Sequence, residues 1–141
     1  MEITIKRDGL KLYGLLEGTT TIKNDTIAIL MHGFKGNLGY DDSKILYALS
    51  HYLNQQGIPT LRFDFDGTGH SNGEFKNMTV FSEILDGMKI IDYAHTTMQA
   101  KKIYRSFLNM LKPVPRLTVY LSRKFVWRLW VQSKKNNYAM S

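Results

Sequence analysis

The segment Thr26-Ile27-Ala28-Ile29-Leu30-Met31-His32-Gly33-Phe34 decides the fold class of this chain. Its first six residues form a short, almost wholly apolar run, which predicts a strand that is buried on both faces of a sheet. A turn with glycines follows, and apolar residues then recur at helical spacing up to Gly57, a helix stop signal. A second strand is predicted over 58–65. Strand, helix and strand in this order are typical of parallel strands joined by a right-handed crossover.

Elements on both sides extend this pattern. Residues 3–7 and 10–16 flank Asp8-Gly9, a strong signal for a two-residue hairpin. After a polar, glycine-rich loop over 66–77, Thr79 can cap a second helix. The expected apolar face of that helix consists of Val80, Phe81, Ile84, Leu85, Met88 and Ile91.

Two further signals complete the predicted order of elements. Asp42 or Ser43 is the expected N-cap of the first helix, and Lys102-Ile103-Tyr104 begins a third parallel strand. The fold class is therefore α/β, with an N-terminal hairpin followed by the start of a parallel, doubly wound sheet.

The charge pattern changes near residue 101. Residues 1–100 hold 9 Lys and Arg against 12 Asp and Glu, a net of −3, whereas residues 101–141 hold 10 Lys and Arg and no acid, a net of +10. Both tryptophans, Trp127 and Trp130, lie in this last stretch. We therefore divide the chain into a domain over 1–104 and a basic aromatic tail over 105–141.

Composition excludes several classes of function. The chain has no cysteine, which rules out a disulfide framework, a thiolate metal site and a cysteine nucleophile. The spacing of the four histidines fits no common zinc pattern, so neither a metal nor another cofactor is expected. No signal peptide and no apolar run of membrane-spanning length are recognised. A cytoplasmic protein without membrane or nucleic-acid partners is the expectation for the first domain.

His32-Gly33-Phe34 stands where ligand sites form in open α/β sheets, beyond the carboxyl end of a strand. The glycine allows a sharp turn that would aim the N–H of Phe34 into a cleft, where it could stabilise an oxyanion. The alternative is a strand-ending turn that contains a histidine with satisfied hydrogen bonds. Taken alone, the tripeptide favours this alternative.

A second motif follows the next strand: Leu61-Arg62-Phe63-Asp64-Phe65-Asp66-Gly67-Thr68-Gly69-His70-Ser71-Asn72-Gly73-Glu74-Phe75. Together with His32-Gly33-Phe34 it resembles the α/β-hydrolase superfamily, and more narrowly the bacterial cinnamoyl or feruloyl esterases, close to the serine-aminopeptidase-like hydrolases. The resemblance covers residues 1–104. It implies a serine carboxylesterase that acts on small acyl esters, with the N–H of Phe34, supported by His32 and Gly33, in the oxyanion hole.

The same resemblance implies that the third strand should lead into a Gly-x-Ser-x-Gly elbow, followed by an acid and a histidine. The sequence continues instead as Arg105-Ser106-Phe107, without an elbow, and no histidine follows His95. Gly69-His70-Ser71-Asn72-Gly73 matches the elbow pattern literally, but it lies in a loop several residues after its strand. Ser71 is therefore a weak candidate nucleophile, and the chain is expected to be catalytically incompetent.

Three interpretations of the tail remain open. If Arg105-Ser106-Phe107 were encoded AGG-TCA-TTC, loss of one nucleotide would yield the elbow residues Gly-His-Ser, so a frameshifted or truncated α/β-hydrolase is the favoured hypothesis. A basic tail that binds membranes or nucleic acid is the rival, and a product without function is the third. A sheet that stops at its third parallel strand would expose an edge, so self-association or aggregation is also expected.

Overall fold

A computed structural model describes residues 1–107 of the chain. Its elements, in chain order, are β1 (Glu2–Arg7), β2 (Leu10–Glu17), β3 (Thr26–Met31), α1 (Ile45–Gln55), β4 (Thr60–Phe63), the 3₁₀ turn η1 (Phe75–Asn77), α2 (Val80–Thr96) and β5 (Lys102–Phe107). The strand that begins at Lys102 thus continues to Phe107. The remainder of the predicted tail lies outside the described residues, so its structure and the division after residue 104 stay predictions.

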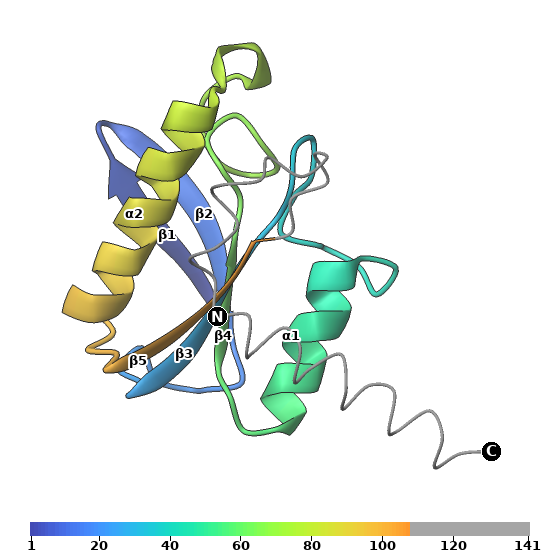
Figure 1. The fold of residues 1–141 in the computed structure, drawn as a ribbon, viewed down its shortest axis with the longest axis vertical. Helices are drawn as coiled ribbons and strands as arrows, with labels where there is room; N and C mark the ends of the chain where they lie inside the picture. Colours follow the sequence, from blue (N-terminus) through green and yellow to red (C-terminus); the bar gives the residue numbers. More distant parts are fainter. Residues whose placement is uncertain (108–141) are drawn as a thin grey trace, which may run out of the picture. The chain divides into compact units, whose positions relative to one another are not determined.

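The strands form one mixed sheet in the order β1-β2-β4-β3-β5 (Figure 1). β1 and β2 are an antiparallel hairpin, and β2 pairs antiparallel with β4. β3 lies between β4 and β5 and pairs in parallel with both. α1 covers one face of this sheet and α2 covers the other (Figure 1). The predicted α/β class and the order of elements are confirmed.

The hairpin turn has the backbone conformation that its sequence predicts. Asp8 and Gly9 have φ of 48° and 83°, so both central residues are in the left-handed region, as a type I′ turn requires. The pairing that follows sets Arg7 opposite Leu10 and Ile3 opposite Gly14. This register places Ile3, Ile5, Leu12 and Leu16 in the core.

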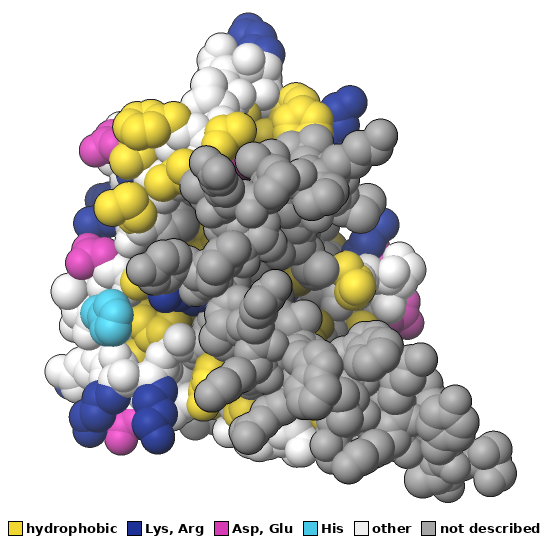
Figure 2. Space-filling view, in the orientation of Figure 1, with side chains coloured by type: hydrophobic (Ala, Val, Ile, Leu, Met, Phe, Trp, Pro, Cys, Tyr) yellow, Lys and Arg dark blue, Asp and Glu magenta, His cyan; other side chains and the backbone are white. Residues whose placement is uncertain are grey.

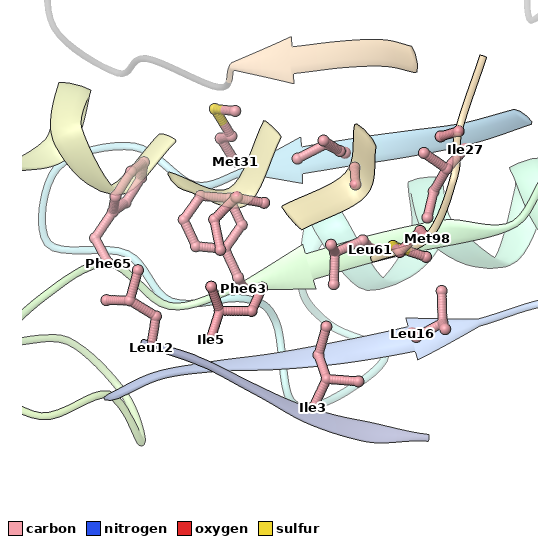
Figure 3. Close-up of a cluster of buried hydrophobic side chains, with 14 residues drawn as sticks. Ile3, Ile5, Leu12, Leu16, Ile27, Met31, Leu61, Phe63, Phe65 and Met98 are labelled. Carbon is pink, nitrogen blue, oxygen red and sulfur yellow. The ribbon is translucent and has the colours of Figure 1, made fainter. Parts of the chain in front are cut away.

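The hydrophobic core lies between the sheet and α2. Strands β1 to β4 contribute buried apolar side chains, Ile103 of β5 packs against them partly buried, and α2 contributes Ile90 and Ala94. Figure 3 shows the strand residues of this cluster, among them Ile27, Leu61 and Phe63, gathered around the helix. Because these side chains are almost completely removed from water, their burial is the main favourable term in folding.

The second predicted strand is shorter than expected: it spans Thr60–Phe63 and not 58–65. Pro59 has no N–H to donate to a ladder, and the side chain of Asp64 accepts hydrogen bonds from the segment after β3 and from the loop after β4. Leu61 and Phe63 alternate with Arg62 as predicted, but the alternation does not separate a buried face from an exposed one. All four residues of β4 are buried.

The expected cap of α1 is wrong. Lys44 occupies the N-cap position and makes no side-chain hydrogen bond to the helix. Asp41 accepts hydrogen bonds from the N–H and the hydroxyl of Ser43, so these polar side chains close a turn just ahead of the helix. The expected cap of α2 is confirmed, because Thr79 accepts from the N–H of Ser82 and Ser82 accepts from the N–H of Thr79.

The expected apolar face of α2 is also wrong in large part. Val80, Phe81, Ile84 and Met88 are exposed, with 69% of Phe81 accessible, and Figure 2 shows hydrophobic side chains on the surface over this part of the helix. The buried residues are Asp86, Gly87, Ile90 and Ala94. Burial of Asp86 sets this orientation, because its carboxylate pairs with Arg7 from β1 and accepts the N–H of Asp66 at 2.8 Å.

No helix in the described part of the chain is both long enough and apolar enough to cross a membrane.

The orientation of α2 predicts contrasting effects of two substitutions. Replacing the exposed Phe81 by Ser should change the free energy of unfolding by no more than about 0.5 kcal/mol. Replacing the fully buried Ile90 by Ala should lower it by about 2–5 kcal/mol, because the substitution opens a cavity under the helix. Urea unfolding followed by circular dichroism measures both values. An equal loss in the two variants would contradict this orientation.

Candidate functional site

A shallow cleft lies beyond the carboxyl ends of β3 and β4. One wall is the turn after β3, with Lys35, Gly36 and Asn37. The other is the loop after β4, with Gly67, Thr68, Gly69 and Phe75. This is the position at which open α/β sheets place their ligand sites.

The first wall is built on a tight turn. The N–H of Gly36 donates to the carbonyl of Gly33 at 2.9 Å, so Phe34 and Lys35 are the two central residues of a four-residue turn. Lys35 has φ of 59° and Phe34 is not in the left-handed region, a combination that defines a type II turn. The room at Gly36 is limited, since a Cβ there would lie 2.8 Å from the carbonyl oxygen of Gly33.

His32 is buried behind this turn and has its hydrogen bonds satisfied. Its Nε2 accepts the N–H of Phe65 at 3.3 Å, so the proton of a neutral ring sits on Nδ1, which donates to the carbonyl of Gly33 at 2.8 Å. Nε2 also lies 3.2 Å from the hydroxyl of Thr68. Burial lowers the pKa of His32, and this exceeds the opposing effects of Gly33 and Asp64. The neutral ring therefore has a structural role at neutral pH, in which it fixes the turn through its hydrogen bonds, and it does not act as a proton carrier.

These contacts determine where the N–H of Phe34 points. The carbonyl of Gly33 is held by both His32 and Gly36. In a trans peptide the C=O and N–H bonds are antiparallel, and the described residues contain no cis peptide. The N–H of Phe34 therefore points away from His32. No group among the described residues accepts it, so it is available to a ligand.

The side chain of Phe34 forms an apolar rim beside this N–H. Its ring is half exposed and lies 5.5 Å from the ring of Phe75, centroid to centroid. The ammonium of Lys35 lies 5.9 Å from the centroid of the Phe34 ring. Phe75 lies in the second motif, but no feature of the sequence marks it as a site residue. Its contribution depends on the fold of the loop over 66–77, which brings it to the opposite wall.

Ser71 does not have the surroundings of a nucleophile. Its hydroxyl donates to the carbonyl of Asp64 at 2.6 Å and accepts the N–H of Tyr13 at 2.9 Å. No imidazole in the described part of the chain forms a hydrogen bond with it, and no helix begins at this residue. The geometry is that of a serine that ties a loop to β2.

The remaining histidines are dispersed. His70 lies between the rings of Tyr13 and Tyr40, at centroid distances of 5.0 and 4.6 Å. His51 contacts Gln55 on α1, and His95 contacts the carbonyl of Ala100. Among the residues that the structure describes, no three His, Asp or Glu side chains converge on a point where they could hold a metal ion.

Comparison with solved structures identifies this arrangement of elements. Est1E from Butyrivibrio proteoclasticus, in a structure with ferulic acid bound, matches with a TM-score of 0.65 and 30% sequence identity, over 74% of this chain and 41% of that one. An esterase from Pyrococcus furiosus matches with a TM-score of 0.63 and 22% identity, over 76% and 39% of the two chains. An α/β serine hydrolase homologue from Coxiella burnetii matches with a TM-score of 0.62 and 19% identity, over 76% and 50%.

The last two similarities, below 25% identity, establish the fold alone. The chain spans half or less of the length of these three structures. No protein-family model matches the sequence, and no curated protein matches it either.

The lowered pKa of His32 predicts a pH-dependent stability. The unfolded chain takes up a proton on this histidine as pH falls below about 6.5, and the folded chain resists it. Stability is therefore fully present above this pH and is lost as pH falls toward the folded pKa. Between pH 7.5 and 5.5, urea unfolding should show a larger loss for the unmodified chain than for His32→Gln. The exposed-site control His51→Gln should retain the full loss, and an unchanged pH dependence in His32→Gln would contradict the assignment.

Proposed function

We propose that this chain, which is the N-terminal part of an α/β-hydrolase over its described residues, carries the oxyanion-stabilising half of a serine carboxylesterase site. The reaction class is acyl transfer from a small ester through a tetrahedral intermediate and an acyl-enzyme. The observation that carries the proposal is the N–H of Phe34, which no described group accepts and which points away from His32, in the turn beside a cleft at the carboxyl ends of β3 and β4.

The N–H of Phe34 has the properties that oxyanion stabilisation requires. Its direction is set before any ligand binds, because His32 and Gly36 hold the preceding carbonyl. A donor that is already oriented needs no reorganisation when negative charge develops on the ester oxygen, and one such donor is typically worth a factor of about 10²–10³ in kcat.

The acyl group is proposed to be aromatic, of the cinnamoyl type. Phe75 lines the cleft, and the ring of Phe34 lies 5.5 Å from the Phe75 ring, so the two rings offer apolar faces near the donor. The similarity to Est1E, whose structure holds ferulic acid, supports the same class of acyl group. An ester with a planar aromatic acyl chain would place its ring against these faces while its carbonyl oxygen meets the N–H of Phe34.

The chain by itself is proposed to be inactive. The 141 residues contain no elbow after β5, and residues 101–141 provide no Asp, Glu or His. The hydroxyl of Ser71 already donates one hydrogen bond and accepts another, both to backbone groups. An oxyanion donor without a nucleophile and base leaves little catalysis.

The purified chain should not hydrolyse 4-nitrophenyl acetate or methyl ferulate faster than the buffer does, because no activated nucleophile is present. The Ser71→Ala variant should give the same rate. Release of 4-nitrophenolate measures the first substrate, and chromatography of free ferulate the second. Turnover by the unmodified chain that disappears in Ser71→Ala would overturn the proposed inactivity.

The role of Phe34 is testable in a chimera in which residues from Arg105 onward are replaced by the part of Est1E that follows its matched segment. We expect this chimera to hydrolyse methyl ferulate. Phe34→Pro removes the N–H at a turn position that suits proline, and it should lower kcat by about 10²–10³. Phe34→Ala keeps the N–H and serves as the matched control, so an equal loss in both variants would show that the ring and not the N–H matters.

A further inference from the structure

Asp64 is a fully buried acidic side chain directly after β4. No Lys or Arg in the described part of the chain forms an ion pair with it. A buried carboxylate without a cation must be compensated by hydrogen-bond donors, and their positions are then tightly constrained.

Three donors surround this carboxylate, and they come from both walls of the cleft. The N–H of Leu38 reaches Oδ1 at 2.7 Å, and the hydroxyl of Tyr40 donates to Oδ2; both belong to the segment after β3. The N–H of His70 reaches Oδ2 at 2.9 Å and belongs to the loop after β4. Burial and the neighbouring carboxylate raise the pKa of the Tyr40 hydroxyl above its usual value, so this hydroxyl remains a donor at neutral pH.

We propose that Asp64 is a positioning residue, which couples the two walls of the cleft and thereby sets the place of the Phe34 N–H relative to Phe75. The catalytic importance of this coupling rests on the proposed function. The coupling itself rests only on the hydrogen bonds of Asp64. One carboxylate joins the segment that carries Phe34 to the loop that carries Phe75, so neither wall can move independently while all three hydrogen bonds are kept.

Arg62 binds the same segment through its backbone carbonyls, whereas Asp64 binds a backbone N–H of the segment. Its Nη1 donates to the carbonyls of Leu38 and Gly39, 2.8 Å away in the case of Leu38. Arg62 and Asp64 are two residues apart at the end of one strand and therefore project to the same face. Leu38 is thus fixed through both its N–H and its C=O. With His32 holding the other end of the turn, the four residues between Gly33 and Leu38 have little freedom.

Gly69 shows how closely the carboxylate approaches the second wall. A Cβ at this glycine would lie 2.0 Å from Oδ2 of Asp64, and Gly69 has φ of 48°. The backbone of the loop therefore rests directly against the carboxylate, with no room for a side chain between them.

The experiment compares the full-length chain with Tyr40→Phe, which removes the hydroxyl donor to Oδ2 together with the 3.2 Å contact of the His70 N–H with that hydroxyl. The N–H groups of Leu38 and His70 keep the carboxylate as their acceptor. Tyr52→Phe is the matched control, because its hydroxyl has no hydrogen bond to any described residue. Amide hydrogen exchange is followed at Leu38 and His70, and at Ile29 and Leu53 as reporters of the core. The nuclear Overhauser contact between the rings of Phe34 and Phe75 reports the relation of the two walls. Asp64→Asn is the second variant.

In Tyr40→Phe the amides of Leu38 and His70 should exchange about tenfold faster or more, because a hydrogen bond to a charged group is lost. The ring contact should weaken, and exchange at Ile29 and Leu53 should change by less than about twofold. Asp64→Asn should abolish the ring contact if it folds; if it does not, Tyr40→Phe decides.

Two results would overturn the inference: a ring contact unchanged in Tyr40→Phe, or faster exchange spread equally over walls and core. Because no ligand or turnover is measured, failure of the proposed esterase role would leave these outcomes unaffected.

Discussion

The structure depends on the satisfaction of two ionisable side chains, Arg62 and Asp64, that leave β4 on the face opposite the hydrophobic core. Leaving a buried charge without partners costs several kcal/mol. The fold therefore brings partners to them. Glu17 on β2 makes a two-pronged ion pair with Arg62, with both N–O distances at 2.8 Å. Burial alone would raise the pKa of Glu17, but its hydrogen bonds to Arg62 and Ser50 lower it below the usual value. Carbonyl and N–H groups of the segment after β3 supply the rest.

This polar face links the sheet to the candidate site. The apolar face of β4 anchors the core through Leu61 and Phe63, and its other face organises loops. Ser50 on α1 joins the same network by donating to Glu17 at 2.6 Å. One short strand, β4, thus packs into the hydrophobic core on one face and hydrogen-bonds to the walls of the cleft on the other. The turn that carries Phe34 is not part of a helix or strand. Its shape is fixed because Asp64 and Arg62 bind the backbone N–H and C=O of Leu38, at the end of the turn segment.

Local sequence signals were sufficient for elements whose partners are close in the chain. The Asp8-Gly9 hairpin, the apolar run over 26–31 and the Thr79 cap were all predicted correctly because each depends on a few neighbouring residues. The face of α2 was not, since its apolar residues occupy more than one side of the helix. The buried face of α2 is determined by Asp86, whose partner Arg7 lies 79 residues away in the chain. The cap of α1 was wrong for a local reason, because Ser43 hydrogen-bonds to Asp41 in a turn and the helix begins only after Lys44.

The candidate site shows the same division. The His-Gly-Phe tripeptide and its place after a strand indicated where an N–H could be offered, and the structure adds why it is free and which way it points. The contribution of Phe75 and the linkage through Asp64 require two loops to meet in space, which spacing along the chain does not encode. Ser71 matched a catalytic pattern in letters, and its backbone partners, Tyr13 and Asp64, became visible only with the fold.

The contact between Gly69 and Asp64 has a consequence for how such a chain can change over generations. A side chain at position 69 would clash with the buried carboxylate of Asp64. A smaller residue at position 64 would leave three hydrogen-bond donors without an acceptor. Each position alone is therefore closed to drift, although a joint replacement could refill the same space. Libraries that vary one site at a time would score both as immutable and would miss the coupled route between them.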